Sequence, residues 1–355
     1  MRTSVTWVND YLDRPASADE QAELLTSAGL NFDGRDTADN GEVWQEIETT
    51  SNRGDCLSHV GMAREVCAMS GRSLKAPSVS LHAKGPAAAS LVRVTNVDHE
   101  GCPRYTARVV RGVKVGPSPE WLQRRLRAIG QIPRNNLVDC TNFVLFEFGQ
   151  PTHVFDLDTL KGGEIRVRPA AAHEPFLPIG EGAAEVKLRA GDLVIADAER
   201  PIAIAGVKGG ALTAVTDRTT NILVEAATFS PRAVRNASRG LRISSDSSYR
   251  FERSVHAAEI DAAAERLVAL ILETAGGELC DGVVEAGAPI PRQRQIDLRP
   301  ARVDAILGVR VPLTEIVRAL ETLGFSPVVR GDVVACTVPA RRTDIEREID
   351  LIEEI

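Results

Sequence analysis

Two stretches that lack both helical and strand periodicity divide this chain of 355 residues. The first, residues 76–90, is rich in Pro, Ser and Ala and predicts a linker. The second is a stretch of Gly and Pro residues at 287–291. Because 355 residues are too many for one ordinary hydrophobic core, we expect three domains, at residues 1–75, 91–287 and 292–355.

Helix and strand patterns are mixed within these segments. Ser17-Ala18-Asp19-Glu20 has the spacing of a capping box and predicts a helix that ends at Gly29, and residues 44–49 indicate a strand. In the central segment we expect a strand at residues 222–224 and a helix over residues 258–275. These patterns predict an α+β multidomain protein, in which a central domain with a mixed sheet is flanked by two small α+β modules.

The composition is typical of a soluble globular protein, with 43% hydrophobic and 26% charged residues. No apolar run approaches the length of a membrane span, and the first residues do not form a secretion signal. We therefore expect a cytoplasmic protein without membrane contact. The 6 cysteines are scattered without a C-x-x-C pair, so they indicate small buried side chains rather than a zinc site.

The charge is acidic overall but locally basic. A net charge of −7 argues against a chain that mainly coats nucleic acid. Basic clusters more often form solvated faces whose charge is balanced by nearby acidic residues. The composition therefore permits RNA contact without predicting it. One cluster holds Arg104, Arg108, Arg111, Lys114, Arg124, Arg125 and Arg127, and the other holds Arg232, Arg235, Arg239, Arg242, Arg250 and Arg253.

A series of short motifs follows in order along nearly the whole chain. They are Thr50–Ser58 (TSNRGDCLS), Cys102–Tyr105 (CPRY), Asn135–Asn142 (NNLVDCTN), Gly149–Asp156 (GQPTHVFD), Ala205–Gly210 (AGVKGG), Val224–Ala227 (VEAA), Ser247–Arg253 (SSYRFER) and Thr343–Glu354 (TDIEREIDLIEE). Each motif alone is weak. Their order and spacing together closely resemble the β subunit of bacterial phenylalanyl-tRNA synthetase.

The resemblance implies an N-terminal module at 1–75, the tRNA-editing domain called B3/B4 at 91–287 and most of the B5 domain at 292–355. Family members usually insert an oligonucleotide-binding domain in the first module, and only residues 35–43 occupy that place here. We therefore expect the inserted domain to be absent. A helical pattern that runs to Ile355 indicates that the chain is part of a longer protein.

The resemblance also implies a function. The chain is expected to be a subunit of phenylalanine–tRNA ligase that binds tRNA(Phe) and hydrolyses mischarged Tyr-tRNA(Phe), without a cofactor for editing. ATP-dependent aminoacylation would belong to the α subunit, in an α2β2 heterotetramer. Two alternatives remain: a stand-alone trans-editing deacylase, and a structural or RNA-binding subunit whose editing site has decayed.

Four residues are expected to carry the editing chemistry. Glu225 follows the apolar strand at 222–224 and is the candidate for reading the tyrosine hydroxyl, with an exposed glutamate as the alternative. His153 is expected to line the pocket, where it would hydrogen-bond the attacking water or the terminal ribose; attack assisted by a ribose hydroxyl is equally compatible. Thr141 and Asn142 would place neutral donors near the ester or the adenosine.

Three further residues are expected to bind the substrate. Gly206 would let the backbone approach it closely. Ser245 and Ser247 stand where the family usually has threonine and alanine, so the pocket keeps its volume, but Ser247 adds a polar group. Lys208 replaces a usual methionine close to Gly206.

The last motif also carries an acidic cluster. Asp350, Glu353 and Glu354 share one helical face by their i, i+3 and i+4 spacing, and Asp344 lies a turn and a half earlier. Acidic residues with this spacing more often form a solvated helix face than a metal site. Mg²⁺ prefers oxygen ligands, and the resemblance implies that these four residues bind Mg²⁺ at a site completed by the α subunit.

Overall fold

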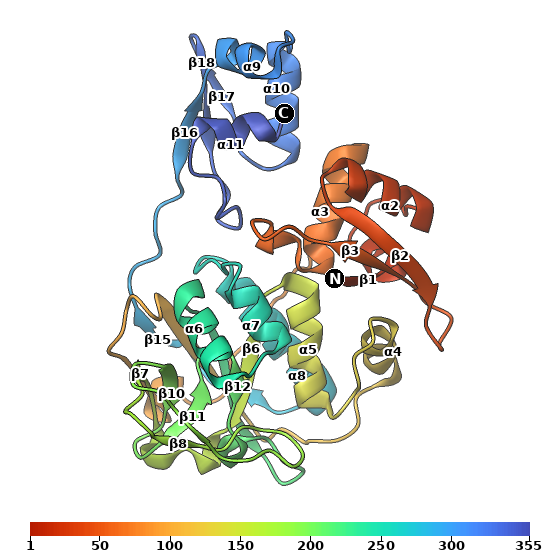
Figure 1. Ribbon diagram of the computed structural model, residues 1–355. Coiled ribbons are helices and arrows are strands. Elements are labelled where there is room, and N and C mark those ends of the chain that lie inside the picture. Colours follow the sequence, from red (N-terminus) through yellow and green to blue (C-terminus); the bar gives the residue numbers. More distant parts are fainter. The chain divides into compact units, whose positions relative to one another are not determined.

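The computed structural model describes residues 1–355, which form two compact units (Figure 1). The first unit combines residues 1–37, 41–76 and 291–355, and the second combines residues 38–40 and 77–290. Both units contain helices and sheets, so the expected α+β multidomain fold is confirmed. No helix has the length and apolar character that crossing a membrane requires.

The N-terminal part of the first unit is an antiparallel sheet of order β1-β3-β2 packed against helices. As the capping box predicts, Ser17 accepts a hydrogen bond from the amide of Glu20 at the start of its helix. Thr37 pairs with Val43, so the stretch expected to replace an inserted domain is a short β-hairpin. The elements are β1 (Arg2–Ser4), α1 (Val5–Asn9), α2 (Ala18–Ser27), β2 (Asn31–Thr37), β3 (Val43–Glu48) and α3 (His59–Ser70).

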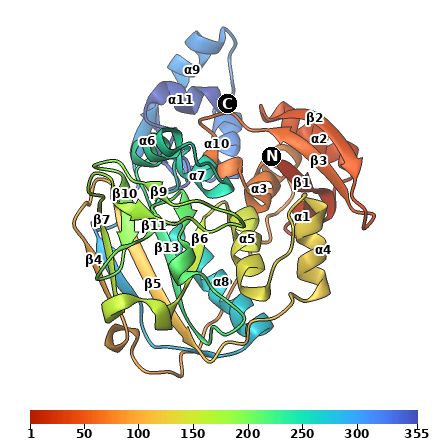
Figure 2. The same ribbon diagram turned by 60° about the horizontal axis from the view of Figure 1, so that its bottom comes forward.

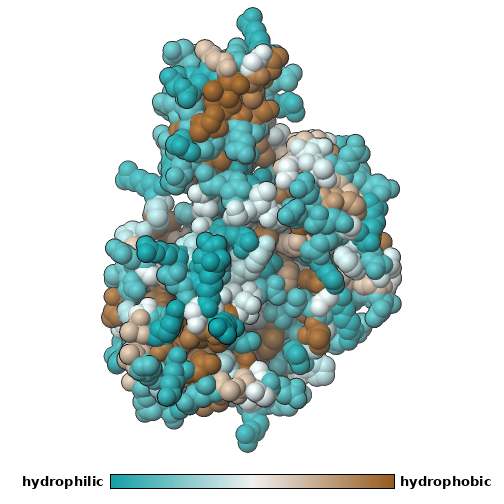
Figure 3. Space-filling view, in the orientation of Figure 1, coloured by the Kyte–Doolittle hydropathy of each residue, from teal (hydrophilic) through white to brown (hydrophobic).

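The C-terminal part of the first unit has a second antiparallel sheet, of order β16-β18-β17. Leu298, Ile316, Leu320 and Phe325 are fully buried in its core. Other apolar side chains of this part are exposed, and Figure 3 shows them as a brown area at the top of the view. The elements are β16 (Gln295–Leu298), α9 (Pro300–Leu307), α10 (Leu313–Thr322), β17 (Val328–Arg330), β18 (Val333–Thr337) and α11 (Glu348–Glu353).

The second unit contains two larger sheets. The first has the order β14-β5-β13-β6 with β15 also paired to β5, and the second has the order β12-β11-β10-β7-β4. Parallel pairing of β4 with β7 makes the second sheet mixed, as expected. The strands are β4 (Arg93–Asn96), β5 (Arg104–Arg111), β6 (Thr152–Asp156), β7 (Glu164–Pro169), β10 (Leu193–Ala196), β11 (Pro201–Ile204), β12 (Lys208–Gly209), β13 (Asn221–Thr228), β14 (Glu278–Leu279) and β15 (Val284–Gly287).

Two layers enclose the sheet that contains β13. Helices α5 and α8 pack against one side of β6 and β13 (Figure 2). The other side shares a hydrophobic core with the second sheet, α6 and α7, to which Tyr105, Leu223, Ile195 and Phe251 contribute. Residues that alternate along β13 therefore face either the α5 and α8 layer or this shared core. The helices of the second unit are α4 (Glu120–Ala128), α5 (Asn136–Phe148), α6 (Pro231–Leu241), α7 (Asp246–Phe251) and α8 (Ile260–Ala275).

Candidate active site

The candidate site begins with the register of three strands. Glu225 on β13 lies opposite His153 on β6 and opposite Ala107 on β5. Side chains two residues apart on a strand point to the same face, so Tyr105 shares that face with Ala107. The sheet thus brings Glu225, His153 and Tyr105 together from three different motifs of the sequence.

Glu225 is a buried acid with one oxygen free. The hydroxyl of Tyr105 donates to its Oε2 at 2.7 Å, whereas Oε1 accepts no hydrogen bond within the protein. Burial raises the pKa of Glu225 to about 7, and the hydrogen bond from Tyr105 partly opposes this rise. Burial and the neighbouring Glu225 raise the pKa of Tyr105 well above its ordinary value, so Tyr105 stays a neutral donor.

His153 is a neutral imidazole with an unused nitrogen. Its Nε2 is shielded from solvent and has no hydrogen-bond partner. Burial lowers the pKa of His153 to about 4, so the ring is uncharged near neutral pH. The ring packs edge-on against Phe155, and a Cβ added at Gly209 would come within 2.6 Å of its Cε1. His153 is therefore held in place by packing and keeps a polar atom available for a small molecule.

A small pocket joins these groups. It measures about 60 Å³, and its walls include His153, Glu225, Gly206, Lys208 and Ser247. That volume has room for several water molecules. Lys208 and Ser247 are half-buried side chains of this wall.

Gly206 has a backbone role as well as a place in the wall. Its φ of +69° is left-handed, and an added Cβ would lie 2.9 Å from both Phe251 and Val234. Glycine is thus needed for the turn after β11 and for close packing on α6 and α7. Close approach of the Gly206 backbone to the substrate stays a prediction.

Ser245 lies outside the pocket wall. It begins α7 as the N-cap, accepting the amide hydrogen of Ser248, while its Oγ donates to the carbonyl of Val207 at 2.8 Å. The neighbouring turn residue Gly206 and the helix residue Ser247 both line the pocket. Ser245 therefore fixes the position of α7 relative to the turn.

Thr141 and Asn142 lie on α5 and are not part of the pocket wall. The hydroxyl of Thr141 donates to the carbonyl of Val138 at 2.7 Å. The structure thus gathers four of the seven predicted editing residues, namely His153, Glu225, Gly206 and Ser247. The roles of all seven residues in editing stay predictions.

Tyr105 was not predicted as a site residue, although it belongs to the CPRY motif. Strand alternation from Ala107 puts Tyr105 on the inner face, but its pairing with Glu225 depends on the register of β5 and β13, which the sequence does not state. Phe251 was also missed as a wall residue.

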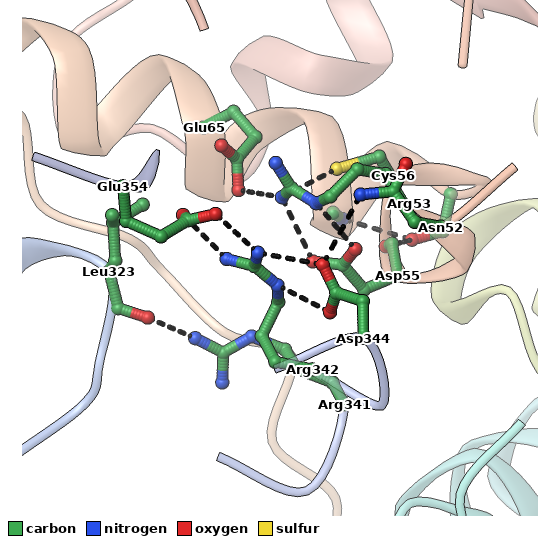
Figure 4. A network of polar contacts seen from close by, with 12 residues as sticks. Asn52, Arg53, Asp55, Cys56, Glu65, Leu323, Arg341, Arg342, Asp344 and Glu354 are labelled. Atoms are coloured by element: carbon green, nitrogen blue, oxygen red, sulfur yellow. Dashed lines mark hydrogen bonds and ion pairs between the residues drawn. The ribbon is translucent and has the colours of Figure 1, made fainter. Parts of the chain in front are cut away.

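The four predicted magnesium ligands lie in the first unit, and two of them, Asp344 and Glu354, surround a buried arginine (Figure 4). Arg342 donates to Asp344 through Nε and Nη2, each at 2.9 Å, and to Glu354 through Nη1 and Nη2 at 2.7 and 2.5 Å. Asp350 instead accepts the amide hydrogens of Glu346 and Arg347, and Glu353 is exposed. The four carboxylates do not form one set of metal ligands here, so magnesium binding stays a prediction that requires Arg342 to move away.

A second buried arginine lies in the same network (Figure 4). Arg53 donates to Asp55 at 3.0 Å, to Glu65 at 2.7 Å and to the sulfur of Cys56 at 3.1 Å. These three acceptors are close enough together to resemble a metal site. Because the guanidinium of Arg53 already satisfies them, we interpret the cluster as an ion-pair network.

Comparison with known proteins matches two family models. The B3/4 domain model matches residues 101–276, and the tRNA synthetase B5 domain model matches residues 296–355. The chain is 44% identical over its whole length to the phenylalanine–tRNA ligase beta subunit of Rhodopirellula baltica and covers 52% of that protein. It is 46% identical over 87% of its length to the corresponding subunit of Chlorobaculum tepidum and covers 38% of it. The chain thus spans about half or less of the length of these relatives.

A solved structure has the same fold. It is an N-terminal fragment of the phenylalanyl-tRNA synthetase beta subunit from Pyrococcus horikoshii, with a TM-score of 0.54 and 17% sequence identity. The similarity covers 100% of this chain and 97% of that fragment.

Proposed function

Because the chain belongs to the family of phenylalanine–tRNA ligase β subunits, we propose that its B3/4 domain hydrolyses the ester of tyrosine with tRNA(Phe). Aminoacylation itself, with its use of ATP, belongs in this proposal to an α subunit in a cytoplasmic α2β2 assembly. The β chain helps to bind that subunit and tRNA(Phe).

Phenylalanine and tyrosine differ by one hydroxyl group. A synthetic pocket shaped for a phenyl ring rejects a substrate that merely adds a hydroxyl by only about 100-fold. A second site improves accuracy if it accepts tyrosine and excludes phenylalanine. Such a site needs a buried polar group that the phenol satisfies and the phenyl ring leaves unpaired.

The free Oε1 of Glu225 is the observation that carries the proposal. Tyr105 occupies Oε2, so the carboxylate is oriented while Oε1 remains available to a phenol donor. A phenyl ring in the same place would desolvate this oxygen without replacing its hydrogen bond, at a cost of about 1–3 kcal/mol. That cost corresponds to a preference for tyrosine of about 5-fold to 150-fold.

Hydrolysis needs a positioned water molecule. With a pKa of about 4, His153 is a weak base near neutral pH, which favours a positioning role over proton abstraction. In our proposal its shielded Nε2 accepts a hydrogen bond from the attacking water. The water oxygen bonds to the ester carbon, the bond from that carbon to the ribose oxygen breaks, and the departing ribose oxygen receives a proton. A neighbouring ribose hydroxyl relays the proton that the water loses.

One observation favours a second candidate function. Lys208 lines the pocket and the pocket is only about 60 Å³ in volume, which suits a subunit that binds RNA but no longer edits. In that alternative no tyrosyl ester would be cleaved even in the complete assembly.

The test measures hydrolysis of Tyr-tRNA(Phe) and Phe-tRNA(Phe) by the complete β subunit with its α partner. Glu225→Ala should lose the preference for tyrosine, His153→Ala should slow hydrolysis, and Glu181→Ala, which changes an exposed glutamate, should match the unaltered protein. Cleavage of neither ester by the unaltered assembly would overturn the editing function and support the RNA-binding alternative.

A further inference from the structure

Helix α6 carries a face of arginines that no part of the proposed editing chemistry uses. Arg232, Arg235, Arg239 and Arg242 are exposed on it, whereas Val234 and Ala237 are buried on the opposite side. No acidic residue occurs from Pro231 to Arg242. We call these four residues the arginine face; along a helix they extend over about 15 Å.

We propose that the arginine face binds the phosphate backbone of the RNA strand whose 3′ end carries the ester into the pocket. This inference rests on the proposed editing function and adds the surface that guides its substrate. Hydrophilic side chains cover the region of α6 in the space-filling view (Figure 3). The partner that matches such a face is a regular polyanion.

The charge of the arginine face is not neutralised by the protein. Arg232, Arg239 and Arg242 form no ion pair, and Arg235 has only a 3.8 Å pair with Glu252. Exposed pairs of this length contribute little. The other basic cluster differs, because Arg104 and Arg108 are buried and pair with Asp261 on α8. Arg104 and Arg108 are therefore less available to a polyanion than the arginine face is.

The arginine face leads directly to the pocket. Val234 of α6 lies against the turn at Gly206, because a Cβ at that glycine would come within 2.9 Å of it. Helices α6 and α7 lie side by side in both ribbon views, and Ser247 and Phe251 of α7 line the pocket. An RNA strand that follows α6 therefore brings its 3′ end to the pocket wall.

An exposed aromatic ring lies next to the arginine face. Tyr249 of α7 is 44% exposed, and the guanidinium of Arg253 lies 3.5 Å from the centre of its ring. The pair between Arg235 and Glu252 brings this end of α7 close to the face. Nucleic-acid bases stack on such rings, whereas an acidic peptide has no base to stack. The ring favours RNA over an acidic protein as the partner.

The experiment compares two triple charge reversals in the full chain. The test variant is Arg232→Glu/Arg235→Glu/Arg239→Glu. The control is Lys161→Glu/Lys187→Glu/Arg218→Glu, which makes the same change in net charge at exposed residues of the same unit that form no ion pair. Thermal unfolding of both variants establishes that they are folded.

Binding of uncharged tRNA(Phe) is measured by fluorescence anisotropy at several salt concentrations. Losing three phosphate contacts should lower the log–log salt slope by about 2 to 3 and weaken binding more than tenfold at low salt in the test variant alone. The proposal would be overturned if the test and control variants bound tRNA(Phe) equally well, whether their binding was unchanged or weakened to the same extent.

A second readout separates this inference from the editing function. Hydrolysis of 3′-O-tyrosyl-adenosine, which lacks the RNA strand, should be equal in the test and control variants, while hydrolysis of Tyr-tRNA(Phe) should fall in the test variant. If neither ester is cleaved by any variant, the editing function fails, yet the binding result still decides the role of the arginine face.

Discussion

Tyr105 donates its hydroxyl hydrogen to Glu225 at 2.7 Å, from the strand β5 to the adjacent strand β13. This bond holds a buried carboxylate in one orientation and leaves its second oxygen without a hydrogen-bond partner, in a residue that lines the pocket. A tyrosine of the protein thus already makes with one carboxylate oxygen the contact that we propose a substrate tyrosine makes with the other.

Tyr105→Phe should therefore change the pH profile of editing. The lost hydrogen bond, about 1.4 kcal/mol, corresponds to a rise of about one unit in the pKa of Glu225. Because the pKa of Glu225 starts at about 7, this rise lowers the ionised fraction of Glu225 at pH 7 from about a half to about a tenth. The preference for the tyrosyl ester should then fall about fivefold. The preference of Tyr105→Phe for the tyrosyl over the phenylalanyl ester, measured from pH 6 to pH 9, should recover at high pH because Glu225 ionises again. Tyr249→Phe, at an exposed ring, should leave the profile unchanged; an unshifted profile in Tyr105→Phe would exclude this role.

Glu225 and His153 should affect stability in opposite directions as pH changes. The pKa of Glu225 is raised from 4.5 to about 7, so its contribution to stability is full below pH 4.5 and is lost as pH rises to about 7. The pKa of His153 is lowered from 6.5 to about 4, so its contribution is full above pH 6.5 and is lost as pH falls to about 4. Each effect is of the order of 3 kcal/mol, and in the unaltered protein they nearly cancel.

Single variants reveal the two effects. Between pH 4.5 and pH 6.5, Glu225→Gln should become more stable with rising pH because only His153 remains, and His153→Phe should become less stable because only Glu225 remains. Denaturant titrations at several pH values measure both slopes. Parallel pH dependence in the two variants would show that the pair does not titrate in this way.

Gly206→Ala should destabilise the second unit. The left-handed φ costs about 1 kcal/mol for alanine, and contacts at 2.9 Å with Phe251 and Val234 add to it. Gly191→Ala is the matched control, because Gly191 has a similar φ of +87° but open space around its Cβ position. The difference between their unfolding midpoints measures the packing contribution, and equal midpoints would show that only backbone strain matters.

Arg342→Met should strongly destabilise the first unit. The substitution leaves Asp344 and Glu354 without their buried partner, and breaking such a pair costs about 3–5 kcal/mol. Arg299→Met breaks the pair with Glu348 at an exposed arginine and should change stability little. Thermal unfolding compares the two variants; similar losses in both would contradict the difference in burial.

Local signals predicted several elements well. The strand expected at residues 44–49 is β3 (Val43–Glu48), and the helix expected at 258–275 is α8 (Ile260–Ala275). Strand alternation and the closing glycine of a helix act within a few residues, so a single sequence contains them. Helix α5 was not predicted, although Asn135 and Gly149 mark its ends, because nine of its 13 residues are buried and no narrow apolar stripe stands out.

Other features depend on contacts between distant residues. The last helix starts at Glu348, so Asp344, which was expected to join the acidic cluster of that helix, lies before it and binds Arg342. Likewise, His153 and Glu225 were predicted as separate candidates, whereas their position opposite each other depends on the pairing of β6 with β13. Strand register is set by the whole sheet, so no local pattern contains it.

The most direct test of the central claim measures both esters of tRNA(Phe) in one reaction with the complete β subunit and its α partner. The unaltered protein should remove the tyrosyl ester and spare the phenylalanyl ester. Glu225→Leu, which removes the free carboxylate oxygen while keeping similar bulk, should hydrolyse the two esters at similar rates. Undiminished selectivity in Glu225→Leu would contradict the account, because the preference for tyrosine would then come from another part of the site.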